Sequence, residues 1–260
     1  MKIATFNING VKARLPAVLD WLKSSAPDVA LLQEIKSQDE TFPREPFEEL
    51  GYNVETHGQK SFNGVAILSK RPIEDVSRGL PGDDEDDQAR WIEAVISGDA
   101  AAVRVCGLYL PNGNPAPGPK YDYKLAWMER LHARAQELLA NEEIALMAGD
   151  YNVMPQAEDV ARPNDWRDDA LFLPQTRDAF QRILYLGFTD AYRTLHPGAE
   201  TYTFWDYQAG AWRKNDGIGI DHILLTPQAA DRLVGSGIEK DVRGGEKPSD
   251  HTPVWCELAL

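Results

Sequence analysis

The sequence predicts an α/β protein, a four-layered α/β sandwich in which helices flank two packed mixed β-sheets. Short apolar runs typical of strands alternate with amphipathic helical stretches along the 260 residues. Some strands follow one another directly, as in hairpins, whereas others are separated by helices. A simple parallel βαβ series therefore does not fit, and two packed sheets with outer helices do. Because strand-like runs extend from residue 3 to about residue 258, we expect a single domain over residues 1–260.

The strands are predicted from short apolar runs that end at polar or turn-forming residues. In chain order they are KIATFNIN, DVALLQE, GVAILSK, WIEAVIS, VRVCGLYLP, IALMAGDYN, IGIDHILLT and TPVWCELAL. Helical spacing of apolar residues predicts helices over residues 15–24, 124–140 and 176–186. Long irregular segments in a compact domain tend to carry function. Here they are residues 41–46, 79–88, 111–119 and 157–169.

The composition is that of an acidic globular protein. Lys and Arg total 27, against 41 Asp and Glu, which gives a formal net charge of −14. This balance argues against a protein that coats nucleic acid. It does not exclude an enzyme that meets a polyanion through a metal ion, because a bound cation can dominate the local field. The acidic run at residues 83–87 is expected to be a solvated loop.

Cysteine usage and the N-terminus indicate where the protein works. Cys106 and Cys256 lie in apolar, strand-like contexts and are expected to be buried free thiols. The segment MKIATFNINGVKAR lacks the apolar core of a signal peptide, and no apolar run is long enough to span a membrane. A cytoplasmic, reducing location is therefore expected.

Polar side chains close several of the predicted strands, where α/β folds place their ligand sites. One such residue is often only a turn or helix cap, but five endings made of carboxylates, amides and a single histidine predict a site. Carboxylates and amides without cysteine suit a hard cation such as Mg²⁺ or Mn²⁺, and a histidine beside an aspartate suits acid–base chemistry. The closing residues are Asn7, Asn9, Glu34, Asp150, Asn152, Asp221, Asp250 and His251.

A set of motifs occurs in one order from residue 3 to residue 255. They are FNING, LLQEIK, GVAILSK, PGDDEDDQAR, GLYLPNG, KLAWM, GDYNV, YTFWDY, KNDGIGIDHILL and EKPSDHTPVW. In this order and spacing the chain resembles the exonuclease III family of apurinic/apyrimidinic DNA-repair endonucleases, within the larger endonuclease/exonuclease/phosphatase superfamily.

The resemblance implies a metal site. Glu34 would be the principal ligand, with Asn7 beside it. Asn9 stands where some relatives carry an aspartate, which would weaken a second metal position. Asp250 would contribute to metal binding or to loop structure. The implied ion is Mg²⁺, for which Mn²⁺ would substitute.

The resemblance also implies roles in hydrolysis. Asp150 would align or deprotonate the attacking water, and Asn152 would orient that water and contact the phosphate. Tyr109 would lie beside the phosphate or the leaving oxygen. Asp221 would hold His251, which would bind the scissile phosphate or act as acid or base.

For substrate binding, the resemblance implies a pocket for a sugar that has lost its base. Phe204 and Trp205 would form one wall and Ile218 and Ile220 the other, since a small apolar pocket can accept a flipped deoxyribose. Relatives often carry Trp-Arg where this chain has Ile218-Gly219, which leaves the pocket size and one polar contact open. Lys12 and Asn112 are expected to contact backbone phosphates.

The implied activity is that of a Mg²⁺- or Mn²⁺-dependent DNA-repair nuclease that hydrolyses the phosphodiester 5′ to an abasic site. A 3′–5′ exonuclease activity and the cleaning of blocked 3′ ends on duplex DNA are also implied. The expected partner is double-stranded DNA with abasic sites or blocked 3′ ends, with no membrane involved, and the chain is expected to be a monomer. Residues 39–99 hold 15 acidic and 6 basic side chains and are expected to face mostly away from the DNA.

Other interpretations stay open. The chain could be a phosphoesterase for phosphoinositides or sphingomyelin, a non-specific deoxyribonuclease, or a metal- or DNA-binding module without catalysis. The 83–87 loop could be an interaction surface. Asn7 could merely cap a turn, and Tyr109 and the aromatics of YTFWDY could belong to the core. His222 follows Asp221 on a strand, so it points to the opposite face and is expected to be structural.

Overall fold

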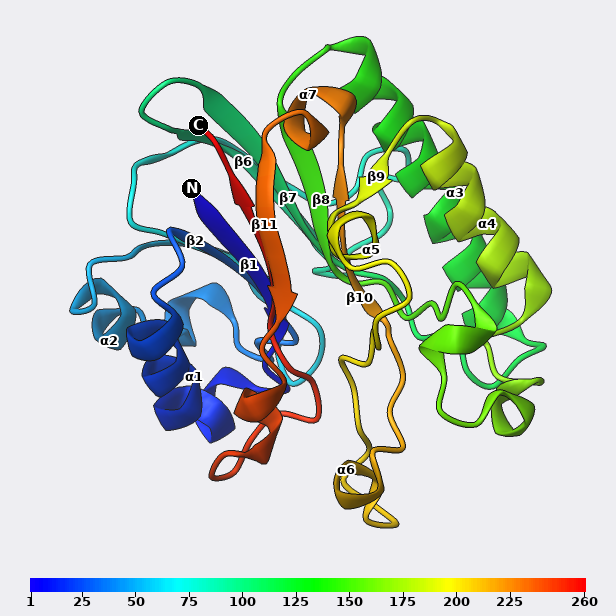
Figure 1. Ribbon diagram of the computed structural model, residues 1–260. Coiled ribbons are helices and arrows are strands. Elements are labelled where there is room, and N and C mark those ends of the chain that lie inside the picture. The colour runs from blue at the N-terminus through cyan, green and yellow to red at the C-terminus, as the bar shows by residue number, and fades with distance from the viewer.

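The computed structural model describes residues 1–260 and confirms the predicted four-layered sandwich (Figure 1). One sheet has the strand order β11-β12-β1-β2-β4-β3 and the other β5-β6-β7-β8-β10-β9. The strands of the first sheet are β1 Lys2–Asn7, β2 Val29–Gln33, β3 Asn53–His57, β4 Val65–Ser69, β11 Leu233–Ile238 and β12 Val254–Leu258. Those of the second are β5 Ile73–Arg78, β6 Trp91–Ser97, β7 Ala102–Tyr109, β8 Ala145–Asp150, β9 Thr189–Asp190 and β10 Asp221–Leu225.

Both sheets are mixed, and each contains one parallel pair. β1 runs parallel to β2, and β7 runs parallel to β8. β12 lies antiparallel beside β1, and β10 lies antiparallel beside β8. The ends of β1, β2, β7 and β8 and the starts of β10 and β12 therefore meet at one end of the sandwich, the lower end in Figure 1.

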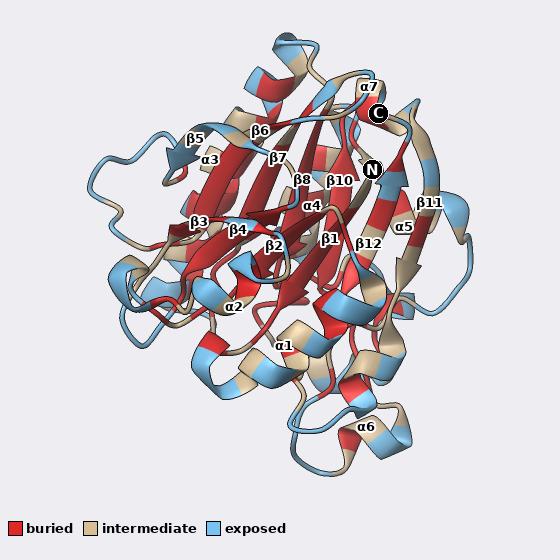
Figure 2. Cartoon of the chain, turned by 90° about the vertical axis from the view of Figure 1, so that its left-hand side faces the viewer, coloured by how far each residue is buried: buried red, intermediate tan, exposed pale blue.

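The main core lies between the sheets because side chains alternate along each strand. In β2, Val29 and Leu31 pack into the inter-sheet cluster, whereas Ala30 and Leu32 pack in the cluster beneath α1. Most strands are buried on both faces, as the red ribbons of Figure 2 show. Cys106 and Cys256 are both buried and free, as predicted.

Helices form the two outer layers. α1 Val11–Ser25 and α2 Glu45–Glu48 cover the first sheet, and α3 Pro119–Ala140 and α4 Pro174–Tyr185 cover the second (Figure 1). The remaining helices are short: α5 Ala191–Leu195, α6 Ala211–Lys214 and α7 Pro227–Ala230. α1 and α3 each begin before the predicted start, because their first turns lack the regular apolar spacing on which the prediction depended. No helix combines the length and the apolar character needed to cross a bilayer.

The acidic run at residues 83–87 is solvated except at one position. Four of its acids are exposed, whereas Asp86 is half-buried and forms an ion pair with Arg130 of α3. The hydroxyl of Tyr123 also donates to Asp86, at 3.0 Å. The run is therefore attached to α3 through its single half-buried carboxylate.

The apolar face of α3 should be a major source of stability. Leu131→Ala removes a fully buried side chain from the core beneath this helix, and we expect it to lower the free energy of unfolding by about 2–5 kcal/mol. Urea unfolding measures this. Gln136→Ala, at an exposed position of the same helix, should change stability by less than about 0.5 kcal/mol. Equal losses in the two variants would contradict the assignment of the core face.

Candidate active site

Polar side chains from both sheets meet at the lower end of the sandwich. Ligand atoms of Glu34, Asp150 and His251 all lie within 4.8 Å of one another. Glu34 follows β2, Asp150 ends β8 and His251 precedes β12. The chain reverses sharply after β2, since Glu34 has a φ of 49°, a conformation that L-residues seldom adopt.

Asn7, the last residue of β1, connects the two carboxylates. Its Nδ2 donates to Glu34 Oε1 at 2.8 Å and to Asp150 Oδ2 at 2.9 Å. Lys36 Nζ lies 2.8 Å from Glu34 Oε2 and also donates to Asn9 Oδ1. Burial raises the pKa of Glu34, but the hydrogen bonds from Asn7 and Lys36 and the charge of Lys36 outweigh it, so the net pKa is lowered. Glu34 is therefore a carboxylate at neutral pH.

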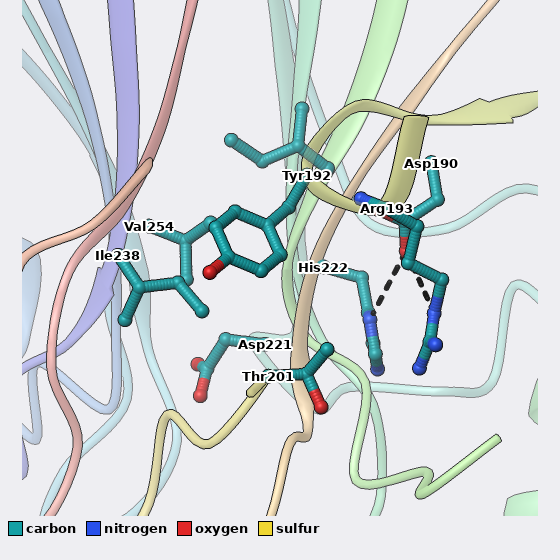
Figure 3. A pocket seen from close by; sticks show the side chains of 9 residues that line it. Asp190, Tyr192, Arg193, Thr201, Asp221, His222, Ile238 and Val254 are labelled. Carbon is teal, nitrogen blue, oxygen red and sulfur yellow. Dashed lines mark hydrogen bonds and ion pairs between the residues drawn. The ribbon is translucent and has the colours of Figure 1, made fainter. Parts of the chain in front are cut away.

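Asp221 holds His251. Its Oδ2 lies 2.9 Å from His251 Nδ1 and accepts a hydrogen bond from Thr203 Oγ1 at 2.6 Å. His251 Nε2 lies 3.7 Å from Asp150 Oδ2. Asp221 Oδ1 is buried without a hydrogen-bond partner, and Asp221 borders a cavity of about 10 Å³ between the sheets (Figure 3).

The protonation of the buried pair follows from its surroundings. Burial raises the pKa of Asp150, assisted by the charge of Asp221 and opposed by that of His251. Burial alone would lower the pKa of His251, but the charges of Asp221 and Asp150 outweigh it and raise it. His251 is therefore held as an imidazolium that can donate through Nε2.

Asn152, Asn112 and Tyr109 lie beside these groups. Asn152 N donates to Asp150 Oδ1 at 2.9 Å, and its side-chain Nδ2 donates to the carbonyl of Leu110 at 2.9 Å. Asn112 Nδ2 donates to Asn152 Oδ1 at 3.3 Å. Burial and the charges of Glu34 and Asp150 raise the pKa of Tyr109 well above its ordinary value, so its hydroxyl remains a donor.

Asn9 and Asp250 lie at the rim. Asn9 Nδ2 donates to Asp250 Oδ1 at 3.1 Å. Asp250 stands outside the three-residue cluster of Glu34, Asp150 and His251. Its neighbour Ser249 donates through Oγ to the carbonyl of Asn7 at 2.7 Å, which holds the loop before β12 against the end of β1.

The expected sugar pocket is only partly formed from the expected residues. Phe204 is half-buried and packs edge-to-face on His251, with ring centroids 5.0 Å apart. Trp205 must be reassigned: it is fully buried, donates to Asn215 and packs against Trp212, so it supports the segment from behind and has no surface for a substrate. Ile218 and Ile220 are buried in a small apolar cluster, and Phe204 packs against that cluster.

Lys12 lies near the start of α1 and is exposed. It borders a groove of about 670 Å³ between α1 and the segment before Ser249. Arg14 and Lys247 also line this groove, together with the acids Asp20 and Glu246.

His222 occupies the opposite face of β10 from Asp221, as alternation predicts (Figure 3). Its Nδ1 lies 3.5 Å from Asp190 Oδ2, and its Nε2 lies 3.1 Å from the carbonyl of Val153. Both ring nitrogens thus face acceptors, which an imidazolium satisfies. His222 supports the segment that follows Asn152 and takes no part in the cluster.

Sequence reasoning missed several supporting residues. Lys36 lies within the LLQEIK motif, and Thr203 lies within YTFWDY, but neither was given a role. Arg90, from PGDDEDDQAR, has its guanidinium 4.8 Å from the centroid of the Tyr109 ring. The motifs themselves were the signal, since each of these side chains supports a residue to which the resemblance assigned chemistry.

The donor set fits a hard divalent cation. Glu34 and Asp150 place carboxylate oxygens close together, and Asn7 holds both carboxylates through hydrogen bonds from its Nδ2. His251 is better placed as a proton donor than as a ligand, because Asp221 holds its Nδ1 and its raised pKa keeps Nε2 protonated. Glu34, which is ionised, would therefore be the principal ligand, and Asp150 is left as the candidate base.

Comparisons with known proteins identify the family. The pattern of the Endonuclease/Exonuclease/phosphatase family matches residues 4–251. Exodeoxyribonuclease III of Haemophilus influenzae is 38% identical, covering 99% of this chain and 100% of that protein. The structure of an AP endonuclease from Archaeoglobus fulgidus matches with a TM-score of 0.94 and a sequence identity of 39%. The structure of a Neisseria 3′ phosphatase bound to a product DNA hairpin matches with a TM-score of 0.95 and a sequence identity of 35%. Both comparisons cover 100% of each chain.

The Asp190–His222 pair should make stability depend on pH. Burial raises the pKa of Asp190 and lowers that of His222, but the hydrogen bond and charge between them outweigh it, so the net pKa of Asp190 is lowered and that of His222 raised. The ionised Asp190 therefore stabilises the folded protein fully at pH values above the ordinary Asp pKa. The contribution of the pair to the free energy of unfolding is complete below the ordinary His pKa. It fades as the pH rises through the raised pKa of His222.

We expect Asp190→Asn, which keeps the cap of α5, to cost about 3 kcal/mol of unfolding free energy near about pH 6 and less near about pH 9. Urea unfolding at both pH values measures this difference. A cost that grows with pH would contradict the charged state of His222.

The metal assignment is tested without activity. Glu34→Gln removes one ligand charge, so we expect Mn²⁺ affinity, measured by calorimetry, to fall by about 100-fold or more. Asp231→Asn, at an exposed position beside α7 at the opposite end of the sandwich, should bind as the unmodified protein does. Unchanged affinity in Glu34→Gln would remove Glu34 from the site.

Proposed function

Because the chain belongs to the Endonuclease/Exonuclease/phosphatase family, we propose that it is a DNA-repair nuclease that hydrolyses the phosphodiester 5′ to an abasic site. One observation carries the proposal. Glu34, Asp150 and the Asp221-held His251 form a single cluster on a chain whose full-length relatives bear the names exodeoxyribonuclease III and AP endonuclease. We further propose removal of 3′-blocking groups, which the DNA-bound Neisseria 3′ phosphatase supports.

Asp150 is suited to take the proton of the attacking water. Its burial raises its pKa, which makes it a stronger base than an exposed carboxylate. Hydrogen bonds from Asn7 and from the amide of Asn152 fix the two carboxylate oxygens. The water would therefore meet an oriented base.

His251 and Tyr109 are suited to donate to the phosphate. The Nε2–H of His251 would stabilise the negative charge that develops on a non-bridging oxygen. The Tyr109 hydroxyl would lie near the phosphate or the leaving oxygen. Asn152 would orient the water, and Asn112 fixes Asn152 through its side-chain oxygen.

We propose Mg²⁺ as the ion, with Mn²⁺ able to replace it. When bound at Glu34, it supplies charge neutralisation for the phosphodiester. Asn7 and Lys36 keep the Glu34 carboxylate oriented and ionised. Asn9 and Asp250 would act at the rim of the metal site through their mutual hydrogen bond.

Phe204 would form the near wall of a pocket for the base-less sugar, because its half-buried ring packs edge-to-face on His251. The buried Ile218 and Ile220 would back that wall. Exposed Lys12 and Asn112 would contact backbone phosphates on either side. The monomeric state, the cytoplasmic location and the outward-facing acidic segment remain predictions.

The rival phosphoesterases are distinguished by substrate. The matched relatives are named for action on DNA, which favours the repair interpretation over a phosphoinositide or sphingomyelin phosphoesterase. Activity on an abasic duplex, an intact duplex and inositol phosphates would distinguish a repair nuclease, a non-specific deoxyribonuclease and a phosphoinositide phosphoesterase.

We expect the purified protein to cleave a duplex containing one tetrahydrofuran abasic analogue when Mg²⁺ is present and to be inactive in EDTA. Asp150→Asn should lower kcat by about 10²- to 10⁴-fold, because the base is lost while the fold is kept. Asp231→Asn is the matched control and should keep full activity. Cleavage that survives chelation, or full turnover by Asp150→Asn, would overturn the mechanism.

A further inference from the structure

Lys124 is a buried lysine that lies outside the site cluster. It belongs to α3, its exposure is 0%, and it comes from the KLAWM motif. Fully buried lysines are rare because the ammonium loses its hydration. Burial lowers the pKa of Lys124 to about 7, although the charges of Asp150 and Asp169 oppose this. Methionine would fill similar space without that cost, so packing alone does not account for a lysine here.

The ammonium is bound by backbone carbonyls from two loops. Lys124 Nζ donates to the carbonyl of Asn152 at 2.6 Å and to that of Asn112 at 3.1 Å. One loop follows β8 and the other follows β7. A Cβ added to Gly113 would lie 2.6 Å from Lys124 Cδ, so the β7 loop packs directly against the lysine stem.

We propose that Lys124 is a positioning residue that holds these two loops together and thereby sets the orientation of the Asn152 and Asn112 side chains. The inference rests on the proposed nuclease function, for which these two side chains orient the water and contact phosphate.

The other contacts of Asn152 explain why the hydrogen bond from Lys124 to its carbonyl matters. Its backbone has a φ of 47°, a conformation that a side chain makes costly. Its N–H donates to Asp150, its Nδ2 to Leu110, and its Oδ1 accepts from Asn112. The carbonyl bound by Lys124 is the one remaining polar group. Without the ammonium, the buried carbonyl of Asn152 loses its donor, and the partly buried carbonyl of Asn112 is no longer tied to it.

The experiment compares Lys124→Met and Lys124→Arg with Leu131→Ala, which destabilises the same helix but removes no hydrogen bond to either loop. On the abasic duplex with saturating Mg²⁺, we expect Lys124→Met to lower kcat by about 10- to 100-fold, with KM within about threefold and Mn²⁺ affinity unchanged. Lys124→Arg, which keeps the charge, should recover most of the rate. Leu131→Ala should retain kcat at a temperature where it is folded.

A second readout does not depend on activity. Amide hydrogen exchange in residues 111–114 and 151–154 should accelerate in Lys124→Met and not in Leu131→Ala. If Lys124→Met does not fold, Lys124→Gln replaces it, since its amide can still donate to one carbonyl.

Two outcomes would overturn the proposal: unchanged kcat and loop exchange in Lys124→Met, or losses matched by Leu131→Ala. If the unmodified protein cleaves neither abasic nor 3′-blocked duplex, the proposed function fails, and the exchange comparison alone decides the role of Lys124.

Discussion

The hydrogen bonds of Asn7 are the interaction on which the site depends. Asn7 ends a strand of the first sheet and Glu34 directly follows another, whereas Asp150 ends a strand of the second. One amide therefore connects the two layers and keeps two carboxylates close despite their repulsion. Everything that sets the position of Asn7 also sets the spacing of these carboxylates, including the pairing of β1 with β2 and the inter-sheet core. The site is thus a property of how the sheets pack.

The fold could be predicted because its signals are local. Alternating apolar residues identify the strands, and the mixture of hairpins and crossovers excludes a purely parallel sheet. The strand order could not be predicted, because nothing local indicates that β12 pairs with β1 or that β10 pairs with β8. The early starts of α1 and α3 were missed for the reason that their first turns are not amphipathic.

Within the site, the residues that end strands could be named from the sequence, whereas their supports could not. Asp150 and His251 follow apolar runs and belong to distinctive motifs. Lys36 and Lys124 are lysines whose importance depends on contacts that arise only after folding. Trp205 shows the opposite error: an aromatic next to Phe204 seemed to share its role, but alternation places it in the core. Folding also pairs part of the negative charge. Asp86 is bound to Arg130, and four site acids accept hydrogen bonds from amides, a lysine or a histidine.

The pairing of β1 with β12 has a consequence for synthesis. β1 has β12 as one of its two neighbours, although β12 is synthesised long after it, and Met1 N donates to the carbonyl of Leu258 at 2.6 Å. A nascent chain therefore cannot close its first sheet until residues 254–258 have left the ribosome, and His251 arrives only just before them. A nascent chain that ends before residue 251 lacks both the histidine and the strand that pairs with β1. The candidate site therefore forms late in synthesis, after the pairing of β1 with β12 becomes possible.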